Sequence, residues 1–315
     1  MSIDLASLAP PNVVEPLDYE QYLAALVGKI IAYAPVDLQE QLRATLALES
    51  EPLTITSQAY AYREVLIRNR VNDAARALML AYAEGADLEH LGALYDTPRL
   101  AGENDTRYRS RIQQSYHRLA AAGPANAYKQ HALSVSADIV DVDVWSEAPG
   151  QVTVAVLARA ETSTASLDEE ALLVSEALFG PPPSPQTAWA PAATDSLILR
   201  QVQAALNAQD VRPLTDHVIV RAALIVPYQI HGVLEVLPGP DATLIKSRRI
   251  SALKTHAATL ARMRHDITLT GIIAAATEPG VKDVRISRPL ANIPIGNGAL
   301  AVCTRIDIHT EAVDA

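Results

Sequence analysis

The stretch PLTITSQAYAYREVLIRNRVNDAARALMLAYA, residues 52–83, decides how the N-terminal part of this chain folds. It opens on a proline, which fits the first turn of a helix, and it holds no other proline or glycine before Gly85. We therefore predict one helix over 52–83 that stops at Gly85. At about 1.5 Å per residue it is roughly 45 Å long, far above the average for globular proteins.

The apolar residues of this long helix form two stripes. One follows an approximate heptad through Leu53, Tyr60, Ile67, Val71, Ala74, Leu78 and Ala81. The other, on a different face, contains Ile55, Ala59, Tyr62 and Leu66. Two apolar faces need neighbours on both sides, so the helix is either the centre of a multi-helix domain or part of a bundle that other chains complete. The candidate partner-interface residues are Leu53, Ile55, Tyr60, Tyr62, Leu66, Ile67, Val71 and Leu78.

Shorter helices are predicted on both sides of the long one. Residues 1–16 carry three prolines and form an extended arm. Asp18 is a plausible N-cap for the first helix and Asp37 for the second. The helical segments we expect are 17–34, 37–50, 87–96, 105–121 and 125–133.

After about residue 137 the apolar period changes from 3.6 to 2. The runs 138–145 and 151–158 alternate around the turn Ala148-Pro149-Gly150, which predicts a β-hairpin. A helix followed by two strands recurs at 197–236 and again at 242–310. Helices between antiparallel hairpins, without βαβ runs of parallel strands, indicate an α+β fold. We predict an N-terminal multi-helix region with a long helix, followed by repeated helix-plus-antiparallel-β-hairpin domains.

These patterns divide the chain into five predicted parts. Residues 161–194 differ in composition, with one short helix at 167–178 and a proline-rich stretch that we interpret as an extended spacer or insertion. The parts are an N-terminal arm and helical bundle region (1–103), a first α+β domain (104–160), the Pro-rich insertion (161–194), a second helix-plus-hairpin unit (195–240) and a C-terminal α+β domain (241–315).

Composition excludes several classes of function. The 26 basic against 36 acidic residues give a net charge of −10, which argues against nucleic-acid binding as the main activity. The single cysteine, Cys303, forms no internal disulfide and no cysteine-based zinc site. There is no secretory signal and no apolar run long enough to span a membrane, so we expect a chain that is made and kept in a cytoplasm.

The sequence contains no recognisable active-site motif. There is no phosphate loop, nucleophile elbow or metal-binding histidine pair, so we expect neither a cofactor nor a metal nor catalysis. Asp141 and Asp143 share one face of a strand, which suits a cation but equally the wet face of a hairpin. The arginines between 107 and 118 suggest a solvated or inter-subunit face, and Cys303 suggests a buried core thiol.

Several longer segments, taken in their order along the chain, resemble a known family. They are IDLASLAPPNVVEPLDYE (3–20), the run from Thr45 through the long helix to Leu100, DTRYRSRIQQSYHRLAAAGPANAYKQHALS (105–134), APGQVTVAVLA (148–158), VRPLTDHVIV (211–220), AALIVPYQI (222–230) and EPGVKDVRISRP (278–289). Together they resemble the baseplate J family of contractile-tailed phages, and equally the corresponding wedge subunit of R-type bacteriocins. The insertion at 161–194 is longer and richer in proline than the family pattern.

The resemblance implies a structural subunit rather than an enzyme. In the family, two copies combine with one copy of a smaller wedge protein of the baseplate protein I type, and six wedges close around the hub and spike, next to the sheath initiator. It implies no nucleic-acid or membrane partner. It also implies assembly in the cytoplasm of the bacterial host, and then a place in the baseplate of the released particle. The alternatives are an enzyme with a site between domains and a stand-alone adaptor that binds through the Pro-rich insertion.

Overall fold

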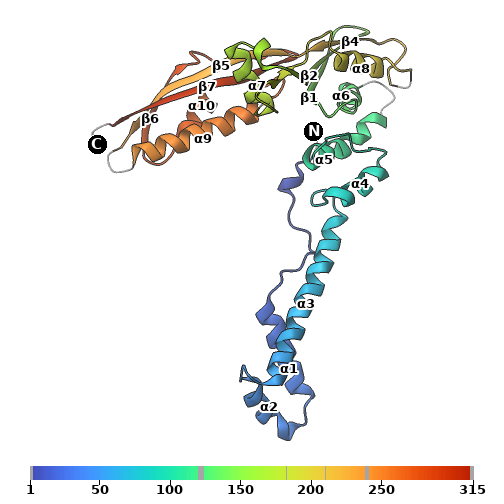
Figure 1. The fold of residues 1–315 in the computed structure, drawn as a ribbon, viewed down its shortest axis with the longest axis vertical. Helices are drawn as coiled ribbons and strands as arrows, with labels where there is room; N and C mark the ends of the chain where they lie inside the picture. Colours follow the sequence, from blue (N-terminus) through green and yellow to red (C-terminus); the bar gives the residue numbers. More distant parts are fainter. Residues whose placement is uncertain (1–2, 120–123, 182, 210, 238–240, 313–315) are drawn as a thin grey trace. The chain divides into compact units, whose positions relative to one another are not determined.

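The computed structural model describes residues 3–119, 124–181, 183–209, 211–237 and 241–312. The chain forms two compact units, one of Met1–Arg99 with Asn104–Gln113 and the other of Leu100–Glu103 with Gln114–Ala315. The α+β class is confirmed, since helices make up the first unit and helices with two sheets make up the second (Figure 1). Among the described residues, no helix has both the length and the hydropathy that crossing a bilayer requires.

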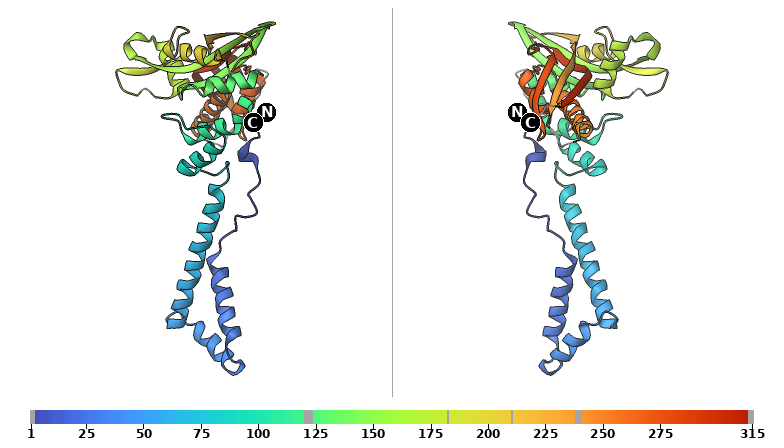
Figure 2. Two further views of the ribbon diagram at one scale, coloured as in Figure 1. Left: turned by 90° about the vertical axis from the view of Figure 1, so that its right-hand side faces the viewer. Right: turned by 90° about the vertical axis from the view of Figure 1, so that its left-hand side faces the viewer.

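The first unit is helical, as predicted. Asp18 caps its first helix by accepting a hydrogen bond from the Gln21 N–H at 3.3 Å. The short turns η1 (Leu5–Ser7) and η2 (Val36–Leu38) flank this helix. The helices are α1 (Tyr19–Tyr33), α2 (Gln39–Leu46), α3 (Pro52–Ala77), α4 (Gly85–Leu94) and α5 (Asp105–Gln114). Both views in Figure 2 show α1 alongside α3, and the two are in direct contact.

The long helix is shorter than predicted. It begins at Pro52 as expected but ends at Ala77, after 26 residues, and the chain then turns before Gly85 starts the next helix. The turn brings Leu80 and Ala83 into a small core with Leu88, Tyr108 and Ile112. Continuing the helix to residue 83 would leave that core without two of its members.

The second unit contains two sheets with helices on them. Its helical elements are η3 (Ser115–Leu119), α6 (Ala125–Leu133), η4 (Thr164–Ser166), α7 (Glu169–Phe179), α8 (Leu197–Leu206), α9 (Ala242–Leu260) and α10 (Leu269–Ala276). Its strands are β1 (Ile139–Ala148), β2 (Gln151–Ser163), β3 (Thr187–Pro191), β4 (His217–Ala222), β5 (Leu224–Val236), β6 (Val281–Arg288) and β7 (Ala299–Ala312). Buried residues of α6 and α8 form one core with β1, β2 and β4, and those of α9 and α10 form another with β5, β6 and β7.

The strand pairing corrects the prediction of repeated hairpins. The first hairpin is confirmed, because β1 and β2 pair antiparallel across the predicted turn. The hairpins predicted in the second and third copies are wrong: β4 pairs with β2 and β5 with β7, both parallel, and the second sheet has the order β6-β5-β7. After β4 the chain crosses directly to the other sheet, since a single residue, Ala223, separates β4 from β5.

The Pro-rich segment is more than a spacer. Residues 159–163 of β2 pair antiparallel with β3, so the chain after the prolines returns to the first sheet. The helix α7, capped by Asp168, packs on β3 and β7. Ser175 of α7 donates a hydrogen bond to the carbonyl of Trp189 in β3. Local composition predicted the extended stretch and the helix but not the return strand.

Asp141 and Asp143 join the two halves of the second unit. The carboxylate of Asp141 accepts a hydrogen bond from the Met263 N–H at 3.1 Å, and that of Asp143 accepts one from the Gly298 N–H at 2.8 Å. Arg264 lies 3.6 Å from Asp143. Both carboxylates are therefore used as structural acceptors between β1 and the segments that flank α9 and β7. Among the described residues no group of three or more possible ligands is arranged to hold a metal ion.

Candidate assembly surface

The long helix α3 turns its small and polar residues inward. Its fully buried positions are Thr54, Ser57, Ala61 and Asn72. A helix usually buries its large apolar residues, because removing their surface from water stabilises the fold. On this buried side Ala61 faces α1, Thr54 donates a hydrogen bond to the Leu46 carbonyl of α2, and Asn72 binds the arm. The large apolar residues are left for other surfaces.

All eight candidate interface residues are exposed in the isolated chain. The least exposed is Leu53 at 39% and the most exposed is Leu78 at 78%. The others, each between 50% and 60% exposed, are Ile55, Tyr60, Tyr62, Leu66, Ile67 and Val71. The structure therefore leaves the predicted surface uncovered within one chain.

The exposed residues lie on two separate faces. At 100° per residue, the stripe of Leu53 and Val71 lies about 80° from the buried side of α3, and the stripe of Ile55 and Leu66 lies about 130° from it. The two stripes are about 150° apart. Three faces with this spacing suit a helix that has a neighbour on every side. Its own α1 occupies one of them.

The rest of the first unit is also rich in exposed apolar side chains. Eighteen of the 28 exposed large apolar side chains in the described part of the chain lie before Arg99. By contrast, the only fully buried apolar residues of α1, α2 and α3 in this part of the structure are Ile31, Leu46 and Ala61. The helical hairpin that α1 and α3 form therefore has almost no hydrophobic core of its own. A helix pair without such a core is only marginally stable in water.

A groove of about 580 Å³ runs between α1 and α3. Tyr22, Leu26 and Lys29 line it from α1, and Tyr60 and Arg68 line it from α3. Arg68 stacks over the Tyr22 ring at 5.1 Å. The groove therefore mixes tyrosine and aliphatic side chains with the polar side chains of Gln21, Lys29, Glu64 and Arg68.

The extended arm is held to α3 by a polar clamp that the sequence did not reveal. The buried amide of Asn72 accepts a hydrogen bond from the Glu15 N–H at 3.0 Å and donates one to the Glu15 carbonyl at 2.9 Å. Arg68 pairs with the carboxylates of Glu15 and Glu64, both at 2.7 Å, and the hydrogen bond to Glu64, followed by that to Glu15, raises its pKa. A single asparagine in a helix forms no repeating pattern, so its hydrogen-bond partner could not be predicted from the sequence.

Arg109 and Arg111 of α5 bind backbone carbonyls within the fold, which corrects the predicted solvated or inter-subunit face at these two positions. Arg109 donates to the carbonyls of Leu80 and Ala83 at 2.7 and 2.6 Å. The buried Arg111 donates to the Pro98 carbonyl at 2.6 Å. The Arg109 guanidinium thus satisfies two carbonyls of the turn between α3 and α4, and the Arg111 guanidinium satisfies one carbonyl in the segment after α4.

The cysteine has no features of a nucleophile. Cys303 lies half-buried in β7, and burial raises the pKa of its thiol to about 11. A thiol is reactive as the thiolate, so this environment makes Cys303 inert near neutral pH.

Comparison with known proteins points to one group. A family model described as the baseplate J-like N-terminal domain matches residues 49–105, and one described as the baseplate J-like central domain matches residues 120–222. The chain is also 37% identical over 327 residues to a protein of Escherichia phage P2 named baseplate protein J, with 99% of each chain covered. The N-terminal family model includes the whole of α3 and its two exposed apolar faces.

Proposed function

The chain belongs to the baseplate J-like family, and on that premise we propose that it is a structural wedge subunit of a contractile injection particle, either a phage tail or an R-type bacteriocin. Two copies of the chain join one smaller wedge protein of the protein I type. Six such wedges form a ring around the hub and spike, next to the sheath initiator. Assembly takes place in the host cytoplasm, and the subunit then remains in the baseplate of the released particle.

One observation supports this proposal most: the two apolar faces of α3 that the chain itself leaves uncovered. Burying a large aliphatic side chain completely contributes about 1.5–3 kcal/mol. The side chains at the centre of α3, such as Leu66 and Ile67, are still about half exposed, so each has roughly 1 kcal/mol to gain from a partner. A bundle in which α3 of two copies and a helix of the smaller protein meet would cover both faces.

The mechanism we propose is mechanical. Several moderate interfaces hold the wedge in one of two arrangements, and a signal from the receptor-binding fibres shifts the balance toward the open baseplate and sheath contraction. The bends we predict are at Ala34 and Pro35, in the Pro-rich segment, and at Gly123 and Pro124, of which Gly123 lies outside the described residues. Ala34 follows α1 in an extended conformation, with φ −75° and ψ 150°, as a break between two helices requires.

Light scattering tests the proposal directly. The chain is measured alone and after co-expression with the product of its small neighbouring gene. A complex of two copies of this chain with one of the neighbour is the expected result. A stable monomer that ignores the neighbour would contradict the wedge assignment.

The adaptor hypothesis makes a different prediction, and the structure sharpens its test. Deleting residues 180–193 would also remove β3, so any loss of binding would be ambiguous. Replacing Pro181, Pro183 and Pro185 by serine keeps β3 and removes the stiff proline sequence. A wedge protein with these changes still assembles, whereas an adaptor loses its partner.

A further inference from the structure

The strand β7 is long and forms one edge of its sheet. It has 14 residues and pairs only with β5, in the sheet order β6-β5-β7 (Figure 2). At its start the Ala299 carbonyl accepts a hydrogen bond from the Arg264 N–H. Beyond Ala299, within the described residues, β7 makes no backbone hydrogen bond to any segment other than β5. Its outer edge thus presents a row of N–H and C=O groups that another strand can bind.

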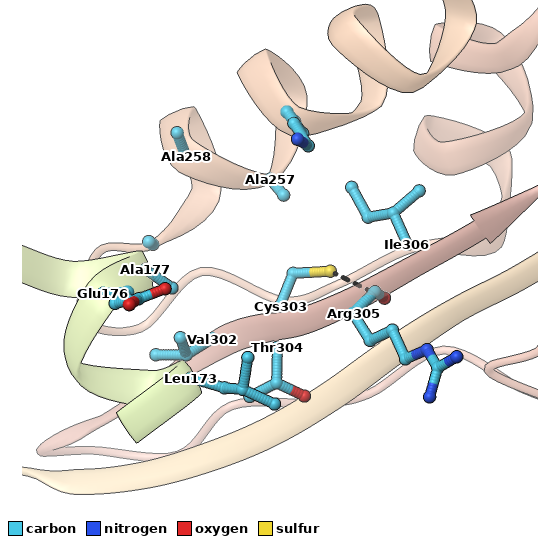
Figure 3. Close-up of a pocket in the computed structure, with 12 residues that line it drawn as sticks. Leu173, Glu176, Ala177, Ala257, Ala258, Val302, Cys303, Thr304, Arg305 and Ile306 are labelled. Carbon is cyan, nitrogen blue, oxygen red and sulfur yellow. Dashed lines mark hydrogen bonds between the residues drawn. The ribbon is translucent and has the colours of Figure 1, made fainter. Parts of the chain in front are cut away.

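A slot of about 360 Å³ follows this edge. Five consecutive residues of β7, 302–306, line it, with Leu173 and Ala177 of α7 on one side and Ala257 and Ala258 of α9 on the other (Figure 3). Successive side chains of a strand point to opposite faces of the sheet. The register of β7 shifts at Thr304, which has no partner in β5, so the alternation is interrupted within the stretch that lines the slot.

The strand at the opposite edge, β6, is complementary to β7 in charge. The stretch 305–311 of β7 carries Asp307 and Glu311 against Arg305, and the eight residues of β6 carry three basic side chains against the single Asp283. On the solvent face of the sheet, Asp307 lies beside His231 of β5 and Arg285 lies beside Val233. Within one chain the Arg285 guanidinium pairs with Glu235 and Glu311, both at 2.8 Å.

The two edges are also complementary in their apolar faces. Ile306 and Ile308 of β7 turn toward the core beneath the sheet, and so do Val284 and Ile286 of β6. Each edge is therefore apolar on one face and charged on the other, as two neighbouring strands of one sheet must be.

We propose that β6 of a second copy of this chain adds to the outer edge of β7 and continues the sheet from one subunit into the next. The added strand runs antiparallel, as β6 does beside β5. Asp307 lies opposite Arg285 of the second copy, with Ile306 opposite Ile286 and Ile308 opposite Val284. This inference names a contact within the proposed ring and so rests on the proposed function, but it does not depend on the α3 bundle, which is a separate contact.

Charge and apolar pattern together select this register. A shift by one residue would place the apolar side chains of one strand on the charged face of the other. A shift by two in one direction places Asp307 opposite Asp283, and in the other direction it places Glu311 opposite Asp283. Like charges directly opposite each other destabilise a strand pair.

The proposed contact joins two different surfaces, the β6 edge of one copy and the β7 edge of the next. Such a head-to-tail interface leaves a free edge at each end, so it either closes into a ring or grows into a fibre. A ring is the arrangement that a baseplate requires.

Disulfide trapping tests the register. In a Cys303→Ser background, the full chain receives Asp307→Cys together with Arg285→Cys, and is oxidised both alone at high concentration and in assembled particles. The expected result is a ladder of covalent oligomers. Within one chain these two positions are two strands apart, about 9.5 Å or more, and a disulfide joins Cα atoms at about 4.4–6.8 Å, so the bond forms only between copies.

The control pair is Glu311→Cys with Arg285→Cys, which the proposed register separates by four residues along the strand. It should cross-link at least several-fold less than the test pair. Equal cross-linking of both pairs would contradict the register, and no oligomers from either pair would overturn the contact.

A second measurement uses the unmodified chain and so does not depend on how the variants fold. Amide exchange at residues 305–309 should slow when the particle assembles, and unchanged exchange there would overturn the inference. A Leu66→Asp chain that no longer binds the small wedge protein but still cross-links through β7 would separate the two contacts. That result would support both contacts and show that they are independent. Normal binding of the small wedge protein, with cross-linking intact, would support the sheet contact and contradict the bundle.

Discussion

Leu66→Asp probes the proposed bundle with the least effect on the chain itself. Leu66 is 51% exposed, and Arg70 lies one helical turn further along, where it suits a carboxylate at position 66. About half of the Leu66 surface is already covered in the isolated subunit, so the substitution should lower the free energy of unfolding of that subunit by about 1 kcal/mol at most.

In the assembled wedge the same change is costly. About half of the Leu66 surface remains to be buried, and losing that contribution costs roughly 1 kcal/mol. Placing an unpaired carboxylate in an apolar helix interface costs several kcal/mol more. A total of about 4 kcal/mol corresponds to roughly a thousandfold weaker association.

The assay combines light scattering of the co-expressed proteins with thermal unfolding of the chain alone. Leu78→Asp, at the C-cap of α3 and on the same side as Leu53 and Val71, tests the other face, and Leu214→Asp, at a site that is 95% exposed in the second unit, is the matched control. The control should assemble normally, and neither α3 variant should. Normal wedges from both α3 variants would refute the bundle assignment.

Three further predictions follow from single residues. Asn72→Ala removes both hydrogen bonds to Glu15, which should cost about 1–3 kcal/mol locally and speed proteolysis of the arm, while Asn69→Ala, which loses only a surface bond to a side chain, should not. Gly92→Ala places a methyl group 1.9 Å from the Tyr108 hydroxyl and should lower the stability of the first unit by about 1–3 kcal/mol, measured by thermal unfolding. Burial raises the pKa of Cys303 to about 11, so iodoacetamide should label the native chain slowly at about pH 8, faster as the pH approaches that value, and fast at any of these pH values in denaturant. Rapid labelling of the native chain at about pH 8 would contradict this.

Local signals in the sequence predicted the elements that depend on neighbouring residues. The cap at Asp18, the start of α3 at Pro52, the bounds of α6 and the hairpin of β1 and β2 are all set by residues within a few positions of one another. Alternation also indicated that 216–236 and 281–310 contain strands. It could not indicate which strands pair, because the partner of a strand is chosen by packing and not by its own pattern.

The same limit applies to the end of α3 and to the clamp on the arm. Helical propensity continues to Ala83, and only the core around Tyr108 makes the turn after Ala77 favourable. Asn72 lies in a helix like many other polar residues, and its pairing with Glu15 depends on how the arm returns along α3. The sequence located the apolar faces of α3, but a single chain cannot reveal what covers them.

The two proposed contact surfaces, α3 and the β7 edge, differ in how far the isolated subunit depends on them for its own stability. The hairpin of α1 and α3 buries little beyond Ile31 and Ala61, so covering α3 with partner helices would stabilise the hairpin itself and couple its folding to assembly. The sheet that contains β7 already rests on a complete core with α9 and α10. Pairing at the β7 edge would therefore link subunits that are already folded. A subunit built this way would form its wedge first and its ring second, because the contact that completes a fold is made before the contact that joins finished surfaces.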